Sequence, residues 1–261
     1  MISKYGLYTY GIIGKDLEQL NILGIDKKNK VYPVEENDLA VLVSKIDTGK
    51  FKKQVKDGLS ELTKAERILR AHEDVVDAIA KLTTIIPFKF GTILKNEKVA
   101  LQMLKNNKEK FKKLLSKFTE REEWGIKVYA DSKKFREYLI YNQPTLKQQT
   151  KKQGELPKGV AYLLGKKIEE EVNNEVARYF SETAKVIFQE MEKFAFEAQI
   201  NKILPQKITG TDKEMLLNSA YLIEKEKVAN FNKHVKRLIE KYETLGLDFK
   251  VSGPWPPYSF T

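Results

Sequence analysis

Short runs rich in branched and aromatic residues recur along the first 120 residues and predict β-strands. These predicted strands cover residues 5–13, 31–35, 39–46 and 84–90. The polar turn at residues 36–38 favours a hairpin between the second and third strands. Apolar residues at every third or fourth position predict helices over residues 63–82 and 97–118, with a shorter helix near residues 15–20.

A similar succession of elements follows in the second half of the chain. Strands are predicted over residues 124–130, 203–208, 215–224 and 247–251. Helices are predicted over residues 132–141, 160–200 and 225–245. Residues 142–158 contain glutamine, lysine, proline and glycine without apolar periodicity, so we expect a loop there.

The order β-α-β-β-α-β in both halves is that of a ferredoxin-like sandwich. We therefore predict an α+β fold with two ferredoxin-like units, which share a topology but no repeat at the residue level. Residues 1–120 would form the N-terminal domain with an extra helix, and residues 121–261 a modified C-terminal domain that includes the docked tail. A helix over residues 160–200 would be about 60 Å long. Because this exceeds a small domain, the helix must project or pair with another helix as in a coiled coil.

The segment from residue 253 to residue 261 is rich in prolines and aromatic side chains. Proline fixes φ and lacks an amide donor, so we expect neither a helix nor a central strand here. The prolines lower the entropy cost of ordering the segment, and the rings offer a large apolar area to bury. We expect the segment to act as a plug that packs on its own domain, so that truncation of Trp255 would strongly destabilise the protein. The alternative, which is compatible with the first, is a surface knob that a partner protein binds. The residues concerned are Pro254, Trp255, Pro256, Pro257, Tyr258 and Phe260.

The turn after the fourth predicted strand contains a second group of aromatic residues. A period of two places Phe88 and Phe90 on one face, and we expect them to pack between the helix at residues 63–82 and the sheet. Gly91 is expected to adopt a positive φ or to allow a close backbone approach. The alternative is an exposed apolar edge that receives a strand from a partner.

Composition narrows the class of protein. With 41% hydrophobic residues and 32% charged residues of mixed sign, the chain can fill a core and is expected to be soluble and globular. The lack of cysteine excludes disulfides and thiolate zinc sites and suits a reducing cytoplasm. The first residues do not form a signal peptide, and no apolar run approaches the roughly 20 residues of a membrane helix. We therefore expect a cytoplasmic protein with no membrane partner.

The net charge of +11 raises nucleic acid as a possible partner. However, only six of the 47 basic residues are arginine, the residue expected to read bases and phosphates. Tyr8 and Tyr10 share one face of a predicted strand, as the base-stacking residues of RNA-recognition domains do, but residues 39–46 contain no aromatic side chain. We expect no nucleic-acid partner. RNA binding and a small-ligand regulatory module are the alternative functions.

The sequence offers few groups for catalysis. Both histidines, His72 and His234, fall in predicted helices, and His72 lies on the apolar side, where packing is a more common role than general base or metal ligand. No phosphate-binding loop, dinucleotide-binding turn, nucleophile elbow or calcium loop occurs in the sequence. The consecutive carboxylates at residues 169–171 do not face one another in a helix. We predict a protein that is not an enzyme, with no catalytic residues, cofactor or metal.

Three blocks of sequence together resemble one known family. The segment Gly-Pro-Trp-Pro-Pro-Tyr-Ser-Phe at residues 253–260 looks like the C-terminal signature of the gas vesicle protein F/L family. Residues 69–76 and 86–92 resemble the family's central helix and the strand-turn after it, and residues 8–12 fit its opening. The blocks lie in the family's order and span essentially the whole chain.

This resemblance implies an accessory or minor structural protein of gas vesicles, the gas-filled protein shells that give some bacteria and archaea buoyancy. Its partners would be the hydrophobic shell protein and other accessory proteins during vesicle assembly. A shell subunit must expose apolar surface before it polymerises, and a soluble protein with aromatic edges can cover that surface. We expect the binding surface to combine the long helix, including Phe194 and Phe196, with a sheet edge and the tail. The resemblance specifies neither the F or L branch nor the oligomeric state.

Overall fold

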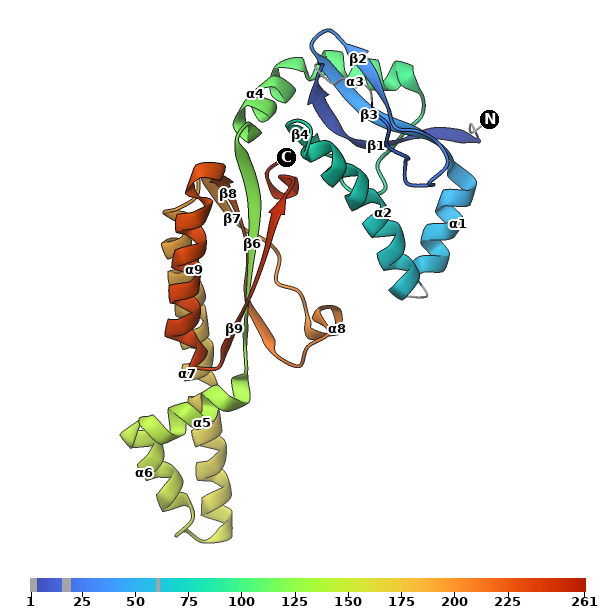
Figure 1. The fold of residues 1–261 in the computed structure, drawn as a ribbon. Helices are drawn as coiled ribbons and strands as arrows, with labels where there is room; N and C mark the ends of the chain where they lie inside the picture. The colour runs from blue at the N-terminus through green and yellow to red at the C-terminus, as the bar shows by residue number, and fades with distance from the viewer. Residues whose placement is uncertain (1–3, 16–19, 60–61) are drawn as a thin grey trace. The chain divides into compact units, whose positions relative to one another are not determined.

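The computed structural model describes residues 4–15, 20–59 and 62–261 (Figure 1). The chain folds into two compact units. The first unit comprises Met1–Glu123 together with Pro254–Thr261, and the second unit comprises Trp124–Gly253. The predicted domain division, 1–120 and 121–261, differs from this in the C-terminal tail, which the structure groups with the first unit because its apolar side chains are buried there.

The first unit is built on an antiparallel sheet. Its strands are β1 (Tyr5–Gly14), β2 (Tyr32–Glu36), β3 (Leu39–Asp47), β4 (Ile85–Pro87) and β5 (Ile93–Leu94). They lie in the order β2-β3-β1-β4, and β5 also pairs with β1. The predicted β2–β3 hairpin is confirmed, and its turn holds Asn37 at a φ of 55°, which asparagine tolerates better than most residues.

Four α-helices occur in the described part of the first unit: α1 (Thr48–Leu59), α2 (Leu62–Ala80), α3 (Glu97–Asn106) and α4 (Lys108–Phe118). The tail, where no helix was expected, adds a single 3₁₀ turn, η2 (Tyr258–Phe260). The predicted helix at residues 63–82 is confirmed as α2, whereas α1 was missed because Phe51 and Val55 are too few to show a periodicity. The helix predicted at residues 97–118 is two helices, since the side chain of Asn107 donates to the Met103 carbonyl oxygen and ends α3. The short helix predicted near residues 15–20 lies largely outside the described residues.

The second sheet consists of β6 (Arg121–Ala130), β7 (Glu197–Ile200), β8 (Glu214–Glu224) and β9 (Leu247–Trp255). Their order is β7-β8-β6-β9, so β7 and β9 are the outer strands. Helices α7 (Lys158–Glu192) and α9 (Val228–Glu243) cover one face of this sheet (Figure 1). The architecture is therefore α+β, with two antiparallel sheets and one long helix.

Helix α7 has 35 residues and a length of about 52 Å at 1.5 Å per residue. The predicted helix at residues 160–200 was wrong at its C-terminal end. There the amides of Phe194 and Ala195 bond to carbonyls three residues back, and the amide of Phe196 donates instead to Leu222 of β8. Pairing with β8 thus overrides the helical pattern and turns residues 197–200 into β7. The strand predicted at residues 203–208 was also wrong, because a short helix, α8 (Gln206–Thr209), begins after Pro205.

Helices α5 (Ser132–Asn142) and α6 (Pro144–Gln153) pack with the first half of α7 and extend beyond the end of the sheet (Figure 1). We call this substructure, residues 132–172, the helical arm. The loop predicted at residues 142–158 was wrong for most of its length. Helix α6 begins with Pro144, which is favourable at a first helical position, but it buries only Leu146, too little to produce an apolar stripe in the sequence.

Gly11 of β1 has no room for a side chain. A Cβ atom there would lie 2.6 Å from the Ile85 side chain and from the Ile86 carbonyl oxygen of β4. We expect Gly11→Ala to lower the free energy of unfolding by about 1–3 kcal/mol through overpacking. Gly14→Ala, at the end of the same strand, meets no atom within 4 Å and is the control. Urea denaturation followed by circular dichroism measures both, and equal effects of the two substitutions would contradict this account of β1.

Candidate functional site

The structure separates the predicted site residues into two groups. The larger group belongs to the first unit and consists of Phe88, Phe90, Gly91, Pro254, Trp255, Pro256, Pro257, Tyr258 and Phe260. Phe194 and Phe196 belong to the second unit. The two groups therefore have separate structural environments.

A buried hydrogen-bond chain through His72 organises the first group. The Nε2 atom of His72 lies 3.1 Å from the carbonyl oxygen of Phe88, which can only accept, so Nε2 carries the proton. Nδ1 therefore accepts from the Tyr8 hydroxyl at 3.0 Å, and the same hydroxyl accepts from the Gly91 amide at 3.1 Å. Burial lowers the pKa of His72 and raises that of Tyr8, so both side chains are neutral. This histidine has the packing role predicted for it.

Aromatic rings surround this hydrogen-bond chain. Tyr10 stacks on His72 with ring centroids 6.0 Å apart, and Phe90 meets the same imidazole edge-on at 5.9 Å. The Tyr10 hydroxyl lies 2.8 Å from the Ser44 hydroxyl and accepts from the Ile25 amide, while burial raises its pKa to about 12. Because Tyr8 and Tyr10 are fully buried, they cannot stack on bases, and this face of the sheet does not support the RNA-binding alternative.

The turn at Gly91 has the backbone geometry that the sequence predicts. Its φ is 82°, in the region that favours glycine. The turn directs the Gly91 amide to Tyr8 and leaves Phe88 and Phe90 partly buried. Phe90 packs against the core of the first unit, which fits the predicted position between helix and sheet.

The tail docks on the first unit through its last residues. Pro256, Pro257 and Phe260 are buried, and the Tyr258 ring lies 6.4 Å from that of His72. The amide and hydroxyl of Ser259 donate to the two carboxylate oxygens of Glu123 at 2.8 and 2.6 Å. Burial raises the pKa of Glu123, and the two bonds from Ser259 oppose that rise. The end of the tail is therefore packed in the first unit and not on residues 124–253, the rest of the domain to which the sequence assigned it. No sequence signal pointed to its bond with Glu123.

Trp255 is not the anchor of this plug. The Trp255 side chain is 40% exposed and Pro254 is also exposed, because both lie at the end of the outer strand β9. Phe260 is buried instead, and the Lys117 ammonium lies 5.5 Å from its ring centroid. We therefore expect the large contribution to stability from Phe260, and not from Trp255.

The two aromatic residues of the second unit have different environments. Phe194 is partly buried against the core, with its ring 4.6 Å from that of His234. Phe196 is 52% exposed and directly precedes β7, on which Ile200 is 61% exposed. Phe194 is therefore a packing residue, whereas Phe196 and Ile200 each expose more than half of their surface.

A shallow hollow of about 450 Å³ lies beside Phe196. It is formed where α7 ends, β7 begins and α9 begins, and it is lined by Lys193, Phe194, Ala195, Phe196, Glu224, Lys227 and Asn230. We call this hollow, together with Phe196 and Ile200, the β7 edge surface. It combines apolar and charged side chains with an outer strand, a combination that suits a protein-binding surface.

Neither a metal centre nor a membrane span is found within the described residues. No group of three or more histidine, cysteine, aspartate or glutamate side chains there is arranged to hold a metal ion. No helix in the same part of the chain is sufficiently long and apolar to cross a bilayer.

Comparison with known proteins identifies the family. The family described as "Gas vesicle synthesis protein GvpL/GvpF" matches residues 6–261. Gas vesicle protein L1 of Halobacterium salinarum is 24% identical, over 98% of this chain and 90% of that protein. Gas vesicle protein F of Nostoc sp. is 27% identical, over 98% of this chain and 97% of that protein. The chain therefore belongs to the gas vesicle GvpL/GvpF family.

Solved structures show the same fold. The crystal structure of GvpF from Anabaena sp. PCC7120 matches with a TM-score of 0.77 at 24% identity, over 98% of this chain and 97% of that chain. The crystal structure of GvpF from Microcystis aeruginosa matches with a TM-score of 0.70 at 24% identity, over 98% of both chains. The resemblance predicted from the three sequence blocks is confirmed.

Truncation of the tail's aromatic residues tests where its anchor lies. We expect Phe260→Ala to lower the free energy of unfolding by about 3–5 kcal/mol, since it empties a buried site. Trp255→Ala removes a side chain that is already 40% exposed and should have a clearly smaller effect. Thermal melting and urea denaturation compare the two variants. A larger loss for Trp255→Ala would show that the anchor is misassigned.

The pH dependence of stability tests the His72 hydrogen-bond chain. The unfolded chain protonates His72 near its ordinary pKa of 6.5, whereas burial lowers this pKa in the folded protein. The stability that depends on neutral His72 is therefore fully present above about pH 6.5. It declines as the pH falls, because the unfolded state then binds more protons than the folded state. We expect wild-type protein to lose more stability between about pH 7 and about pH 5 than His72→Gln, which retains a donor and an acceptor but does not titrate.

Urea denaturation at each pH makes this comparison. The raised pKa values of Glu73, Asp77 and Glu123 change stability in the opposite direction, but they do so in both proteins, so the difference between the two curves isolates His72. Parallel curves would mean that His72 titrates normally in the folded protein.

Proposed function

We propose that this protein is a non-enzymatic accessory or minor structural protein of gas vesicles, which acts in the cytoplasm and at the vesicle. It binds the hydrophobic shell protein, other accessory proteins, or both during assembly. Membership of the GvpL/GvpF family supports the role in gas vesicles. The observation that carries the binding role is the β7 edge surface, where Phe196 and Ile200 are exposed beside an outer strand.

The chemistry of this surface suits an apolar protein segment. An outer strand can receive an extended segment from another chain, while exposed side chains on it provide contact area and the hollow beside it accepts a side chain. Lys193, Glu224 and Lys227, which also line the hollow, keep the surface hydrated when no partner covers it. The protein can in this way cover an apolar shell subunit before it polymerises.

Both units are, in this proposal, variants of one βαββαβ scaffold. In each sheet the second strand in sequence is outermost, followed by the third, the first and the fourth. This is the strand order that a βαββαβ chain produces in a ferredoxin-like sheet. The helical arm and α7 are the elaborations that distinguish the second unit.

Charged substitutions on the β7 edge surface test the binding role. In a pull-down, we expect the double variant Phe196→Glu with Ile200→Glu to bind purified shell protein about tenfold less than wild type, or weaker still. The reason is that burying carboxylates opposes an apolar contact. Ile208→Glu is the matched control, since Ile208 is exposed on α8 and is not part of the surface. Phe194 is not substituted, because a charge there would disturb the core.

Undiminished binding by the double variant would reject the β7 edge surface but leave the function open. Deletion of the gene in its vesicle-forming host tests the function itself. We expect the deletion strain to lack vesicles and wild-type protein to restore them. Normal vesicles in the deletion strain would contradict the proposed function.

A further inference from the structure

The tip of the helical arm, residues 151–167, combines exposed apolar side chains with positive charge. Its exposed apolar residues are Leu156, Val160, Tyr162 and Leu163, with exposed fractions between 38% and 68%. The same segment contains five lysines and one glutamate, a net charge of +4. These lysines are Lys151, Lys152, Lys158, Lys166 and Lys167. Isolated exposed apolar residues are ordinary, but here Val160 and Leu163, three residues apart, share one face of α7 and form a small apolar patch in a basic segment.

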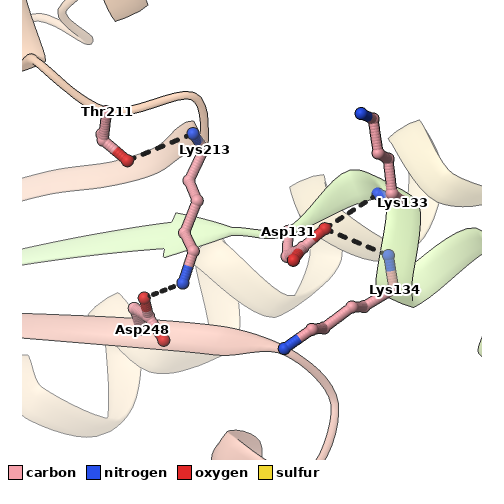
Figure 2. A network of polar contacts seen from close by, with 6 residues as sticks. All are labelled: Asp131, Lys133, Lys134, Thr211, Lys213 and Asp248. Carbon is pink, nitrogen blue, oxygen red and sulfur yellow. Dashed lines mark hydrogen bonds and ion pairs between the residues drawn. The ribbon is translucent and has the colours of Figure 1, made fainter.

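The base of the arm is fixed to the second sheet. Figure 2 shows the Asp131 side chain accepting from the backbone amides of Lys133 and Lys134, both at 3.1 Å, and so capping α5. Beside this cap, Lys213 forms an ion pair with Asp248 of β9. The start of α5 is held next to the sheet by two further bonds. The Ser132 hydroxyl donates to the Glu214 carboxylate of β8 at 3.2 Å, and the Asp131 amide donates to the Gly246 carbonyl oxygen at 3.1 Å.

The helices of the arm are also joined to one another along their length. Arg136 of α5 bonds to Asn173 of α7. The Gln153 side chain at the end of α6 donates to the Ala161 carbonyl oxygen of α7 at 3.0 Å. A Cβ atom at Gly165 would collide with this Gln153 side chain, so glycine permits the close packing of α6 on α7. The arm therefore presents its tip in a defined conformation rather than as a loose loop.

Charge changes sign along α7 just beyond the tip. Lys166 and Lys167 are followed by Glu169, Glu170 and Glu171, all exposed. Within the tip the Lys166 ammonium lies 4.9 Å from the Tyr162 ring centroid, which holds positive charge next to apolar surface. The tip is thus an apolar patch bordered by lysines and limited by glutamates.

The complement of such a patch is an apolar stripe bordered by carboxylates. We propose that the arm tip is a docking site for an acidic amphipathic helix of another protein. Leucine-type side chains of that helix contact Val160 and Leu163, and its carboxylates pair with the surrounding lysines. The glutamates beyond Lys167 repel an acidic partner and so limit the contact to about the first three turns of α7.

Two other anionic partners fit the tip less well. Nucleic acid is recognised with arginines and stacking aromatic rings, but the tip contains no arginine and only one aromatic ring, Tyr162, with the Lys166 ammonium over one of its faces. An anionic bilayer favours a long basic helix that lies flat, whereas α7 turns acidic at Glu169. A protein helix needs only a short matching surface.

This site is independent of the β7 edge surface. The arm tip includes the start of α7, and the edge surface begins where α7 ends. Loss of binding at one surface can therefore be measured while the other is unchanged.

Binding of a designed peptide to the full-length protein tests the proposal. The probe is a fluorescein-labelled helix of about 18 residues, with leucines along one face and glutamates elsewhere. We expect saturable binding by fluorescence anisotropy, which weakens as salt is raised. Lys166→Glu with Lys167→Glu should weaken binding by about tenfold or more. Leu163→Ser, a neutral change of an exposed side chain, should weaken binding without altering the fold.

Matched controls separate the arm tip from the overall positive charge. Lys233→Glu with Lys236→Glu on α9 makes the same change in charge away from the tip and should leave binding unchanged. A scrambled peptide of identical composition, without an apolar face, should bind more weakly by about tenfold. Circular dichroism verifies that each variant is folded. Absence of peptide binding, equal effects of the two charge reversals, or tighter binding to single-stranded DNA or phosphatidylserine vesicles than to the peptide would overturn the proposal.

Discussion

The hydrogen-bond chain through Tyr8 and His72 is the constraint on which the first unit depends. It joins β1, α2 and the turn at Gly91 inside the core, and each donor in it has one suitable acceptor. A buried imidazole with only one partner would leave a polar atom unsatisfied, which costs about 1–3 kcal/mol. The positive φ of Gly91 completes the chain, because it directs the amide of that residue to the Tyr8 hydroxyl. The tail then packs Tyr258 against the same imidazole.

The second unit differs, because only part of its long helix α7 contributes side chains to the core. The C-terminal half of α7 packs on the sheet through residues such as Ile187 and Met191, both fully buried. The N-terminal half belongs to the arm and leaves most of its circumference in solvent. The two ends of α7 therefore lie beside two distinct surfaces. The arm tip, which is basic and apolar, includes its start, and the β7 edge surface lies at its end. One helix supports both surfaces and separates them along its length.

Much of the fold could be predicted where the buried residues form a recognisable pattern. The strands β1 and β3 are nearly continuous buried runs of branched, aromatic and small residues, and α2 has apolar residues at helical spacing. The three sequence blocks were sufficient to indicate the family. Helix α6 could not be predicted, because a helix that buries only Leu146 has no stripe. Residues 197–200 continue the apolar spacing of α7, and only pairing with β8 makes them a strand. The bond between Glu123 and Ser259 joins residues far apart in sequence, so no local sequence pattern could predict it.

The placement of the tail has a consequence for how the chain is made. Residues 124–253 are an insertion between the two segments that form the first unit. When a ribosome has completed residue 123, the site for Phe260 is still empty, and it stays so until the whole insertion has been translated. At about 5–20 residues per second this delay is roughly 7–26 s. During that interval the nascent first unit exposes the apolar site that the tail will later fill.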